Sequence, residues 1–458
     1  MKLSSYIVIQ KIKKGYVIFS TISKTIIEVN EDFYKELINI QNLDIDKLKY
    51  ITEENIDYLK RNYFIVDCDI DERCIVDYKM NKDRLHQQVF SSYIAFSTLC
   101  NFACVYCYEE GQSERKHIMD EETLAHTLNW YEKIIIKNNY RELQVCLFGG
   151  EPLLHKDLIK EFVSKLSNIV KKHNAELVLT MVTNGYLLDN EIVSFLKNYN
   201  LNEIQITIDG PEEIHNQRRP LRAGGPTFQR IIENIKSIDK FNGGFLFRVS
   251  FDKSNKDSIK EVLRYIKGLN IKNKYVVYLA PIHNTTNQEC NHCSFCCKNV
   301  YKDQEETINT YKELYSYMKE IGLNIPKYYT NGPCMLVSND TVLIDPYGDL
   351  YKCVEMISIK NLCVGNVKDK EYNDKYYQFV GRPLYNKCIE SECKYVCLCG
   401  GGCLMENYVN HKNMEKVNCE LKYFEELIPF FLKEKYDEWH RKLFKHNIWK
   451  YSIQNNHK

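Results

Sequence analysis

The chain has 458 residues, of which 44% are apolar, and its 62 Lys and Arg residues nearly balance 61 Asp and Glu residues. This length suits two or three domains with a large core, and the balanced charge gives no field of the kind that marks a nucleic-acid or membrane binder. The N-terminus has too short an apolar run for a signal peptide, and no stretch approaches the roughly 18 apolar residues of a membrane span. We therefore expect a cytoplasmic protein with no nucleic-acid or membrane partner.

Nineteen cysteines are the unusual feature of the composition. Disulfides do not persist in a reducing cytosol, so cysteines in such numbers indicate metal binding there. Most of them fall into dense groups that chance scatter explains poorly. The four scattered ones are interpreted as small hydrophobes, and they are Cys68, Cys74, Cys146 and Cys363.

Residues 1–85 are predicted to form a small separate unit of short strands and two helices. A charged run, 67–73, follows its last strand and is interpreted as an exposed linker. The expected strands are 6–10, 15–21, 24–29 and 63–67, and the expected helices are 31–40 and 52–61.

From residue 93 to about 280, the sequence alternates between strand and helix patterns. The strand candidates are almost continuously apolar, which is typical of parallel strands covered on both faces. Six such β/α repeats predict an α/β fold, an open and partial barrel with its chemistry at the C-terminal strand ends. The strands are expected at 93–98, 143–149, 177–183, 203–209, 245–251 and 275–280, and the helices near 120–139, 155–173, 189–199, 226–241 and 257–268.

The remaining third of the chain has few long periodic elements. Residues 283–333 are expected to form a connection with one helix near 303–321, and 334–419 is dense in cysteine. The tail 420–445 is predicted to be an amphipathic helix, and Pro429 is a residue that can kink it.

Three cysteines, Cys100, Cys104 and Cys107, form the run C-x3-C-x2-C directly after the first barrel strand. Thiolates are the usual ligands of iron–sulfur cubes, normally four to a cluster. Three thiolates leave one iron free for a ligand that is not protein, which favours cluster chemistry over electron storage. Taken alone, the run also suits a zinc site that lacks its fourth ligand or a fragment of a ferredoxin motif.

Polar and glycine residues stand where the next three strands end. Two glycines in the turn FGGEP let the backbone approach a ligand closely, and the glutamate can accept hydrogen bonds from an ammonium group. The fourth strand ends with groups that can bind a ribose, and with an arginine that can pair with a carboxylate. Each motif alone is equally typical of turns and solvated charges. The residues are Gly149, Gly150, Glu151 and Pro152, then Thr183 and Asn184, then Thr207, Asp209 and Arg219.

Together, the cysteine run, the GGEP turn and the segment DGP-x-x-x-H, in this order, resemble the radical S-adenosylmethionine (SAM) enzyme superfamily. The resemblance implies a catalytic [4Fe–4S] cluster on Cys100, Cys104 and Cys107, whose free iron chelates SAM. It also implies that Gly149, Gly150 and Glu151 hold the methionine ammonium. A 5′-deoxyadenosyl radical would then abstract a hydrogen atom from the substrate, while the protein positions the cofactor and excludes water.

The C-terminal cysteines resemble the SPASM extension of this superfamily, which carries two auxiliary [4Fe–4S] clusters, so the resemblance implies three clusters in all. From the residues alone, one or two zinc sites are the alternative. The family's outer cluster is matched by Cys388, Cys393, Cys399 and Cys419, and its inner cluster by Cys334, Cys353 and Cys403.

Two departures from the family pattern leave these ligand sets open. The usual C-x2-C opening is C-x4-C here, and Cys397 is extra, so it could replace Cys393 or Cys399. Tyr328 stands where some relatives have a fourth inner cysteine. The inner cluster therefore has an open iron, which could bind a substrate thiolate, or borrows a ligand from elsewhere.

A third cysteine group has metal-site spacing that the SPASM pattern does not predict. It could donate the missing inner ligand, bind zinc or hold a further cluster. It consists of Cys290, Cys293, Cys296 and Cys297, with His283 and His292 nearby.

The unit 1–85 resembles the winged-helix-like peptide-recognition domain of many peptide-modifying radical SAM enzymes. The resemblance implies that a leader peptide adds a strand to an exposed sheet edge; a dimerisation or packing module is the alternative. The implied domains are peptide recognition (1–85), radical SAM core (86–282), connection (283–333), SPASM domain (334–425) and C-terminal helix (426–458).

We therefore expect a radical SAM/SPASM maturase of a ribosomally made precursor peptide, which forms cysteine thioether cross-links and takes electrons from a flavodoxin or ferredoxin. An anaerobic sulfatase maturase is one alternative, although those enzymes carry an aspartate where Val354 stands. Carbon–carbon bonding or epimerisation of a peptide, and a metal-binding protein without SAM chemistry, are the others.

Overall fold

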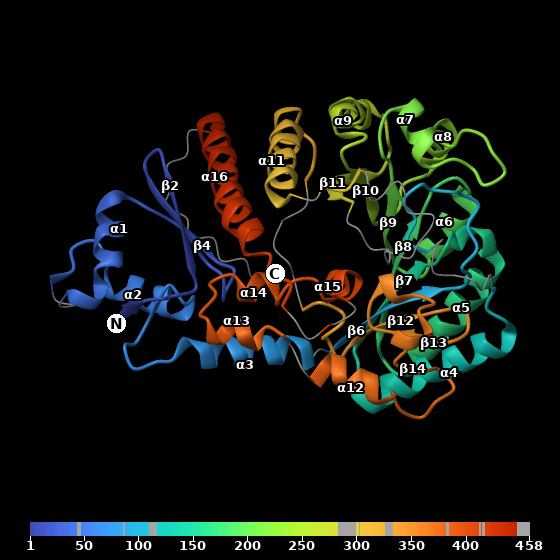
Figure 1. Ribbon diagram of the computed structural model, residues 1–458, viewed down its shortest axis with the longest axis horizontal. Coiled ribbons are helices and arrows are strands. Elements are labelled where there is room, and N and C mark those ends of the chain that lie inside the picture. Colours follow the sequence, from blue (N-terminus) through green and yellow to red (C-terminus); the bar gives the residue numbers. More distant parts are fainter. Residues whose placement is uncertain are drawn as a thin grey trace.

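Figure 1 shows the computed structural model, with the N-terminal unit at one end, the large sheet and its helices at the other, and C-terminal helices between them. The N-terminal and core regions are thus bridged by the last quarter of the chain. The structure describes residues 1–446 apart from 44–46, 86–87, 110–116, 283–298, 302, 326–332, 382–383, 412–413 and 415–416.

A nine-stranded sheet with the order β11-β10-β9-β8-β7-β6-β12-β13-β14 forms the core. Strands β6 to β11 each pair in parallel with their sequence neighbours, so their carboxyl ends share one edge. This arrangement confirms the six predicted strands and the open barrel. The strands are β6 Val89–Ala95, β7 Glu142–Phe148, β8 Glu176–Thr183, β9 Leu201–Thr207, β10 Gly244–Phe251 and β11 Lys274–Pro281.

Amphipathic helices pack on the outside of this sheet and confirm the predicted helical stretches. Alternate strand residues such as Ile204, Ile206 and Phe247 are fully buried against them. One short helix, α7, follows β9 and was not predicted. The helices are α4 Glu121–Asn138, α5 Lys156–Lys172, α6 Asn190–Lys197, α7 Glu212–Arg218, α8 Phe228–Ser237, α9 Ile259–Gly268 and α11 Gln304–Glu320.

The cysteine-rich segment extends the same sheet. Strand β12 (Thr341–Ile344) pairs in parallel with β6, and β13 (Asp349–Tyr351) pairs antiparallel with β12. A further strand, β14 (Gly365–Asn366), pairs with β13. These strands are too short to show a period in the sequence, so they were not predicted. Cys353, two residues beyond β13, packs in the same apolar cluster as Tyr93 of β6 and Tyr108 of the first cysteine run.

The N-terminal unit contains a three-stranded antiparallel sheet with the order β2-β3-β4, whose strands lie within or beside the predicted stretches 6–10, 15–21 and 24–29. Asn30 caps the first helix, and Thr52 with Asn55 forms a capping box at the start of the second. The elements are β1 Lys2–Leu3, β2 Ile7–Ile12, β3 Gly15–Ser20, β4 Ile26–Val29, α1 Glu31–Ile38, α2 Glu53–Arg61 and β5 Ile65–Val66, which pairs with β1.

The predicted exposed linker at 67–73 is wrong in its last part, because helix α3 begins at Glu72 and continues to Leu85. Glu72 is 5% exposed and accepts a hydrogen bond from Ser5 N at 3.0 Å. Arg84 is also buried and donates to Tyr385 Oη at 2.7 Å. Charged residues at buried helix positions hide the usual apolar pattern, because their partners come from distant parts of the chain.

The C-terminal segment forms short helices and ends in α16 (Leu421–His446), which confirms the predicted tail helix and contains Pro429. In Figure 1, α16 lies between the N-terminal sheet and α11. Its Ile428 and Leu432 pack with Val8 and Phe19 of that sheet. Among the described residues, no helix has the length and apolar character that crossing a membrane would need. The short helices are α12 Asp374–Gly381, α13 Asn386–Glu390, α14 Val396–Cys399 and α15 Leu404–His411.

Candidate functional site

The first cysteine run forms a loop at the carboxyl edge of the sheet, directly after β6. Cys100, Cys104 and Cys107 are all half-buried in it. The loop turns back on itself, because Phe102 N donates to Cys100 Sγ at 3.4 Å and Cys107 N donates to Cys104 O at 3.1 Å. Burial, with help from the nearby Glu151 and Cys104, raises the pKa of the Cys100 thiol to about 12.

A second segment, 218–222, runs beside this loop and holds it through backbone hydrogen bonds. Phe102 and Leu221 form an isolated antiparallel bridge between the two segments. The cysteine loop is therefore shaped by residues that follow β9, more than a hundred positions later. The hydrogen bonds run from Ala103 N to Pro220 O at 2.9 Å, from Val105 N to Arg218 O at 3.0 Å and from Arg222 N to Asn101 O at 2.8 Å.

The glycine turn after β7 packs directly against the chain that leads into the cysteine loop. Gly149 has a φ of +120°, and a Cβ there would lie 2.6 Å from Ser97 O. A Cβ on Gly150 would lie 2.3 Å from Leu99 O. Only residues without a Cβ fit this approach, and Gly150 N uses it to donate to Ser97 O at 3.1 Å.

Glu151 joins the ends of β7 and β8. Its carboxylate is 1% exposed and accepts hydrogen bonds from Thr183 Oγ1 and from Asn184 N, each at 2.7 Å. The side-chain nitrogen of the same residue, Asn184 Nδ2, donates to Asn101 Oδ1 at 2.8 Å and lies 4.0 Å from Cys100 Sγ. The predicted residues of the second and third strand ends are thus brought together with the cysteine loop. Pro152, also predicted, is buried at the start of the short helix that follows Glu151.

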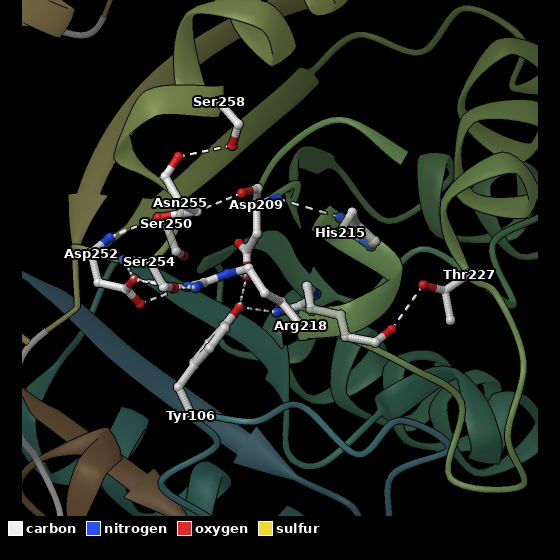
Figure 2. Close-up of polar contacts among 11 residues, drawn as sticks. Tyr106, Asp209, His215, Arg218, Thr227, Ser250, Asp252, Ser254, Asn255 and Ser258 are labelled. Atoms are coloured by element: carbon white, nitrogen blue, oxygen red, sulfur yellow. Dashed lines mark hydrogen bonds and ion pairs between the residues drawn. The ribbon is translucent and has the colours of Figure 1, made fainter. Parts of the chain in front are cut away.

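The fourth strand end meets the same loop, as Figure 2 shows. Asp209 is fully buried, and its Oδ2 accepts a hydrogen bond from the Tyr106 hydroxyl of the cysteine loop. Arg219 Nη1 donates to the same hydroxyl at 2.6 Å. Thr207 is the last residue of β9 and lies in register with Arg248 of β10. The sequence identified Asp209 and Arg219 as separate candidates, and the structure joins them through Tyr106.

The charged side chains around Asp209 are buried and form ion pairs with one another. Arg218 places its Nε 3.5 Å from Asp209 Oδ2 and its Nη2 2.9 Å from Asp252 Oδ2. His215, the last residue of the DGP-x-x-x-H segment, accepts a hydrogen bond from Asp209 N through Nδ1 at 3.3 Å. Burial, with help from the Arg219 charge, lowers the pKa of His215 to about 3, so its ring is neutral. Sequence reasoning missed Tyr106, Arg218 and Asp252 as site residues, because only their contacts distinguish them from ordinary polar residues.

The predicted inner set comes from three segments, because Cys334 precedes β12, Cys353 follows β13 and Cys403 precedes α15. Burial raises the pKa of the Cys353 thiol, and the neighbouring Glu355, Cys334 and Cys403 add to the effect. Burial also raises the pKa of Cys403, to about 11. Burial raises the pKa of Tyr108, next to Cys107, and the charges of Cys107 and Cys353 add to the effect, so Cys353 lies near the first cysteine loop.

The predicted outer set lies around the short helices α13 and α14. Cys393 N donates to Cys388 O at 2.9 Å. Burial raises the pKa of the Cys388 thiol, and the charge of Cys419 adds to the effect. Burial also raises the pKa of Cys399, and the charge of Cys388 adds to it. The extra cysteine, Cys397, packs with Tyr6, Val76 and Tyr385 in an apolar cluster shared with the N-terminal unit.

The remaining cysteines divide into two kinds. Of the four scattered ones, Cys146 is buried and Cys363 is half-buried, whereas Cys68 and Cys74 are exposed. Among the described residues, no three His, Cys, Asp or Glu side chains converge as ligands of a single metal ion. The third group lies outside the described residues, as does Tyr328; it comprises Cys290, Cys293, Cys296 and Cys297 with His283 and His292.

The residues present at the first site fit an iron–sulfur cluster with a polar ligand beside it. Three thiols share one loop, and thiolates are the donors that such clusters take. Next to them, Asp209 Oδ1 and Arg219 Nε are buried and have no hydrogen-bond partner among the described residues. A carboxylate oxygen and a guanidinium nitrogen with unused capacity suit a charged ligand that carries an amine, a carboxylate or hydroxyls.

Residues 94–266 match the family model described as the radical SAM superfamily. Among curated proteins, the chain is 22% identical to the radical SAM cyclopropyl synthase TigE of Paramaledivibacter caminithermalis, over 92% of this chain and 93% of that protein. It is 24% identical to a cysteine-type anaerobic sulfatase-maturating enzyme of Clostridium perfringens, over 67% of this chain and 86% of that protein.

Two solved structures share the fold. The chain superposes on anSMEcpe with bound AdoMet and Cp18Cys peptide with a TM-score of 0.57 and 20% identity, covering 79% of this chain and 99% of that one. It superposes on Streptococcus suis SuiB bound to the precursor peptide SuiA with a TM-score of 0.52 and 15% identity, covering 92% of this chain and 99% of that one.

Proposed function

Because the chain contains a radical SAM domain and is a radical SAM enzyme, we propose that it modifies a ribosomally made peptide in a SAM-dependent reaction. One observation carries the proposal: a loop with three cysteines lies against the ends of β7, β8 and β9, where buried polar groups gather. When bound, a [4Fe–4S] cluster and SAM supply reductive cleavage of a C–S bond and abstraction of a hydrogen atom. The residues of this chain bind, orient and shield that chemistry.

Each strand end has a part in this proposal. Cys100, Cys104 and Cys107 ligate the cluster. Gly149, Gly150 and Glu151 face the methionine ammonium, and the carboxylate of Glu151 is already oriented by three hydrogen bonds. Pro152 fixes the turn, Thr183 and Asn184 orient Glu151, Thr207 and Asp209 lie on the ribose side, and Arg219 binds the cofactor carboxylate.

Two auxiliary clusters belong to the same proposal. The inner cluster is ligated by Cys334, Cys353 and Cys403, whose mutual electrostatic effects support a shared site. The outer ligands are proposed to be Cys388, Cys393, Cys399 and Cys419. Cys397 packs in the same cluster as Cys388 and Cys393, so it is the alternative to Cys393 or Cys399.

The substrate is proposed to be a cysteine-containing precursor peptide whose leader binds the N-terminal unit. The three-stranded sheet β2-β3-β4 supports this, because among the described residues no strand pairs with the outer side of β2 or β4, and main-chain pairing can extend such an edge. SuiB, which shares the fold over 92% of this chain, is bound to a precursor peptide in its structure. Electrons are proposed to come from a flavodoxin or ferredoxin.

The proposed reaction joins a cysteine sulfur to a carbon atom as a thioether. The match to a cyclopropyl synthase over 92% of the chain favours a second candidate, closure of a carbon–carbon bond within the peptide. In both reactions the peptide loses two hydrogens per bond, but only the thioether consumes a thiol.

Co-expression of the enzyme with a cysteine-containing precursor peptide tests the proposal. The modified peptide should be lighter by two hydrogens per bond and should resist alkylation at the cross-linked cysteines. A lighter peptide whose cysteines all alkylate would favour carbon–carbon bonding. An unmodified peptide, produced beside enzyme that cleaves SAM, would contradict peptide modification. A Cys100→Ala, Cys104→Ala, Cys107→Ala enzyme is the control.

A further inference from the structure

The Tyr106 hydroxyl lies where the cysteine loop meets the end of β9 and the segment after α7 (Figure 2). It donates to Asp209 Oδ2 and accepts from Arg219 Nη1 at 2.6 Å. Tyr106 immediately precedes Cys107, while its two partners lie more than a hundred residues later in the chain. One oxygen atom thus connects the cysteine loop to the buried cation beside it.

Asp209 is a fixed anchor for this hydroxyl. Its side chain is fully buried, and its backbone is held on both sides, because Asn255 Nδ2 donates to Asp209 O at 2.6 Å and Asp209 N donates to His215. Its carboxylate is held separately, by the Tyr106 hydroxyl and by Arg218 Nε at 3.5 Å, since an unpaired buried charge would be strongly destabilising. Asp209 therefore has little freedom to follow the loop, and Tyr106 takes its position from Asp209.

Arg219 takes its orientation from the same oxygen. The side chain is 8% exposed, and its guanidinium lies 5.8 Å from the centre of the Phe102 ring. After burial, the charge of Cys104 has the largest effect on the pKa of Arg219, so the cation lies beside a proposed cluster ligand. Without the hydroxyl, Nη1 would lose its acceptor and the long side chain would gain rotational freedom.

We propose that Tyr106 is a positioning residue, whose hydroxyl sets the place of Arg219 relative to the three cysteines and anchors the cysteine loop to Asp209. The inference rests on the proposed function, because Arg219 is the group proposed to bind the carboxylate of SAM. A hydroxyl with only a structural role would satisfy Asp209 and affect stability alone. A positioning role also affects cofactor affinity and the motion of the loop.

Tyr106→Phe removes the hydroxyl and keeps the ring, and Tyr140→Phe is its matched control. Tyr140 is also buried, at 4% exposure, and donates to a buried carboxylate, Asp340 Oδ1, at 2.5 Å. It lies just before β7, at the amino ends of the parallel strands and away from the cysteine loop. Both changes remove one buried hydrogen bond to an acid, and Tyr106→Phe also removes the one from Arg219 Nη1, so its cost in stability should be the larger of the two.

Two measurements separate the roles. In metal-free protein, the amide hydrogens of Ala103 and Val105 should exchange about tenfold faster in Tyr106→Phe than in wild type or Tyr140→Phe. In anaerobically loaded protein, the dissociation constant for SAM should rise about tenfold in Tyr106→Phe alone. The electron paramagnetic resonance spectrum of the SAM-bound reduced protein should also change in that variant.

The inference is overturned if Tyr106→Phe matches Tyr140→Phe in both exchange and SAM affinity. A change in exchange without any change in SAM affinity or spectrum also overturns it, because the hydroxyl would then serve the loop alone. Failure of wild-type protein to bind or cleave SAM would instead contradict the proposed function. In that case, the exchange measurement on metal-free protein still decides whether Tyr106 anchors the loop.

Discussion

The first cysteine loop and the outer cysteine region are held by different means. Buried charges surround the first loop, among them Asp209, Arg218 and Arg219. The outer region lies in apolar packing, where Tyr395, Leu398 and Ile428 share one cluster with the N-terminal sheet. A site that must orient a charged, exchangeable ligand needs fixed polar groups, whereas a site whose ligands all come from the protein needs shielding and spacing. The contrast agrees with a reactive first site and an auxiliary outer one.

Removing ligands from each region gives the largest expected effect. Replacing Cys100, Cys104 and Cys107 with alanine should reduce 5′-deoxyadenosine formation to background. Replacing Cys388 and Cys399 should leave SAM cleavage but abolish peptide modification. Each protein should lose about four irons per chain, as expected for one cube. Chromatography of the nucleoside and colorimetric iron analysis measure the two effects.

The division of roles would be wrong if both sets of variants lost SAM cleavage to the same extent. It would also be wrong if the first set retained cleavage while losing iron. Far-ultraviolet circular dichroism of each variant provides the control for folding.

The buried pair of Arg218 and Asp252 should dominate the stability of the first region. Its two side chains are 4% and 0% exposed, so Arg218→Met would leave Asp252 buried without its partner, at a cost of about 3–5 kcal/mol. Lys137→Ala breaks an exposed pair with Glu371, 66% and 63% exposed, and should cost at most about 1 kcal/mol. Urea denaturation of the metal-free proteins measures both, and equal costs would contradict a stabilising role for the buried network.

One glycine in each region tests the close backbone contacts. A Cβ on Gly402 would lie 1.8 Å from Asn418 O, and one on Gly149 would lie 2.6 Å from Ser97 O. Gly402→Ala should reduce iron in the outer region, and Gly149→Ala should reduce SAM affinity. Gly224→Ala is the control. Gly224 also has a positive φ, of +83°, but a Cβ there would have no other atom within 4 Å.

Strain of the backbone alone costs about 1–2 kcal/mol, so Gly224→Ala should affect stability only. If all three variants lose the same amount of iron and SAM affinity, the contacts at Gly149 and Gly402 have no specific role. Equilibrium dialysis with labelled SAM measures the affinity, and iron analysis measures the iron content of the three variants.

The effect at neutral pH is smallest for His215, whose contribution changes only as the pH is lowered. Its pKa is lowered from about 6.5 to about 3 by burial, so the unfolded chain binds a proton between these pH values and the folded chain does not. The neutral His215 ring therefore makes its full contribution to the free energy of unfolding above pH 6.5. That free energy falls by up to about 1.4 kcal/mol per unit as the pH is lowered toward 3. In His215→Gln, the free energy of unfolding, measured by urea denaturation, should depend less steeply on pH by that amount. An unchanged slope would contradict the neutral, buried ring.

The core and its motifs could be predicted from the sequence because their signals are local. Strands such as 245–251 are continuous apolar runs, and the cysteine spacing is visible within eight residues. The network at Tyr106 could not be predicted, because its partner Asp209 lies 103 residues away. Helix α3 was missed because Glu72 and Arg84 occupy buried positions, and β12 to β14 are too short to show a period.

The central claim is that SAM binds at the loop of Cys100, Cys104 and Cys107. Electron paramagnetic resonance of a reduced Cys353→Ala, Cys388→Ala, Cys399→Ala protein, in which the first cluster is the main signal, tests it directly. Addition of SAM should shift the spectrum, because the cofactor would bind the iron that lacks a cysteine. A spectrum that is unchanged at saturating SAM would contradict the account.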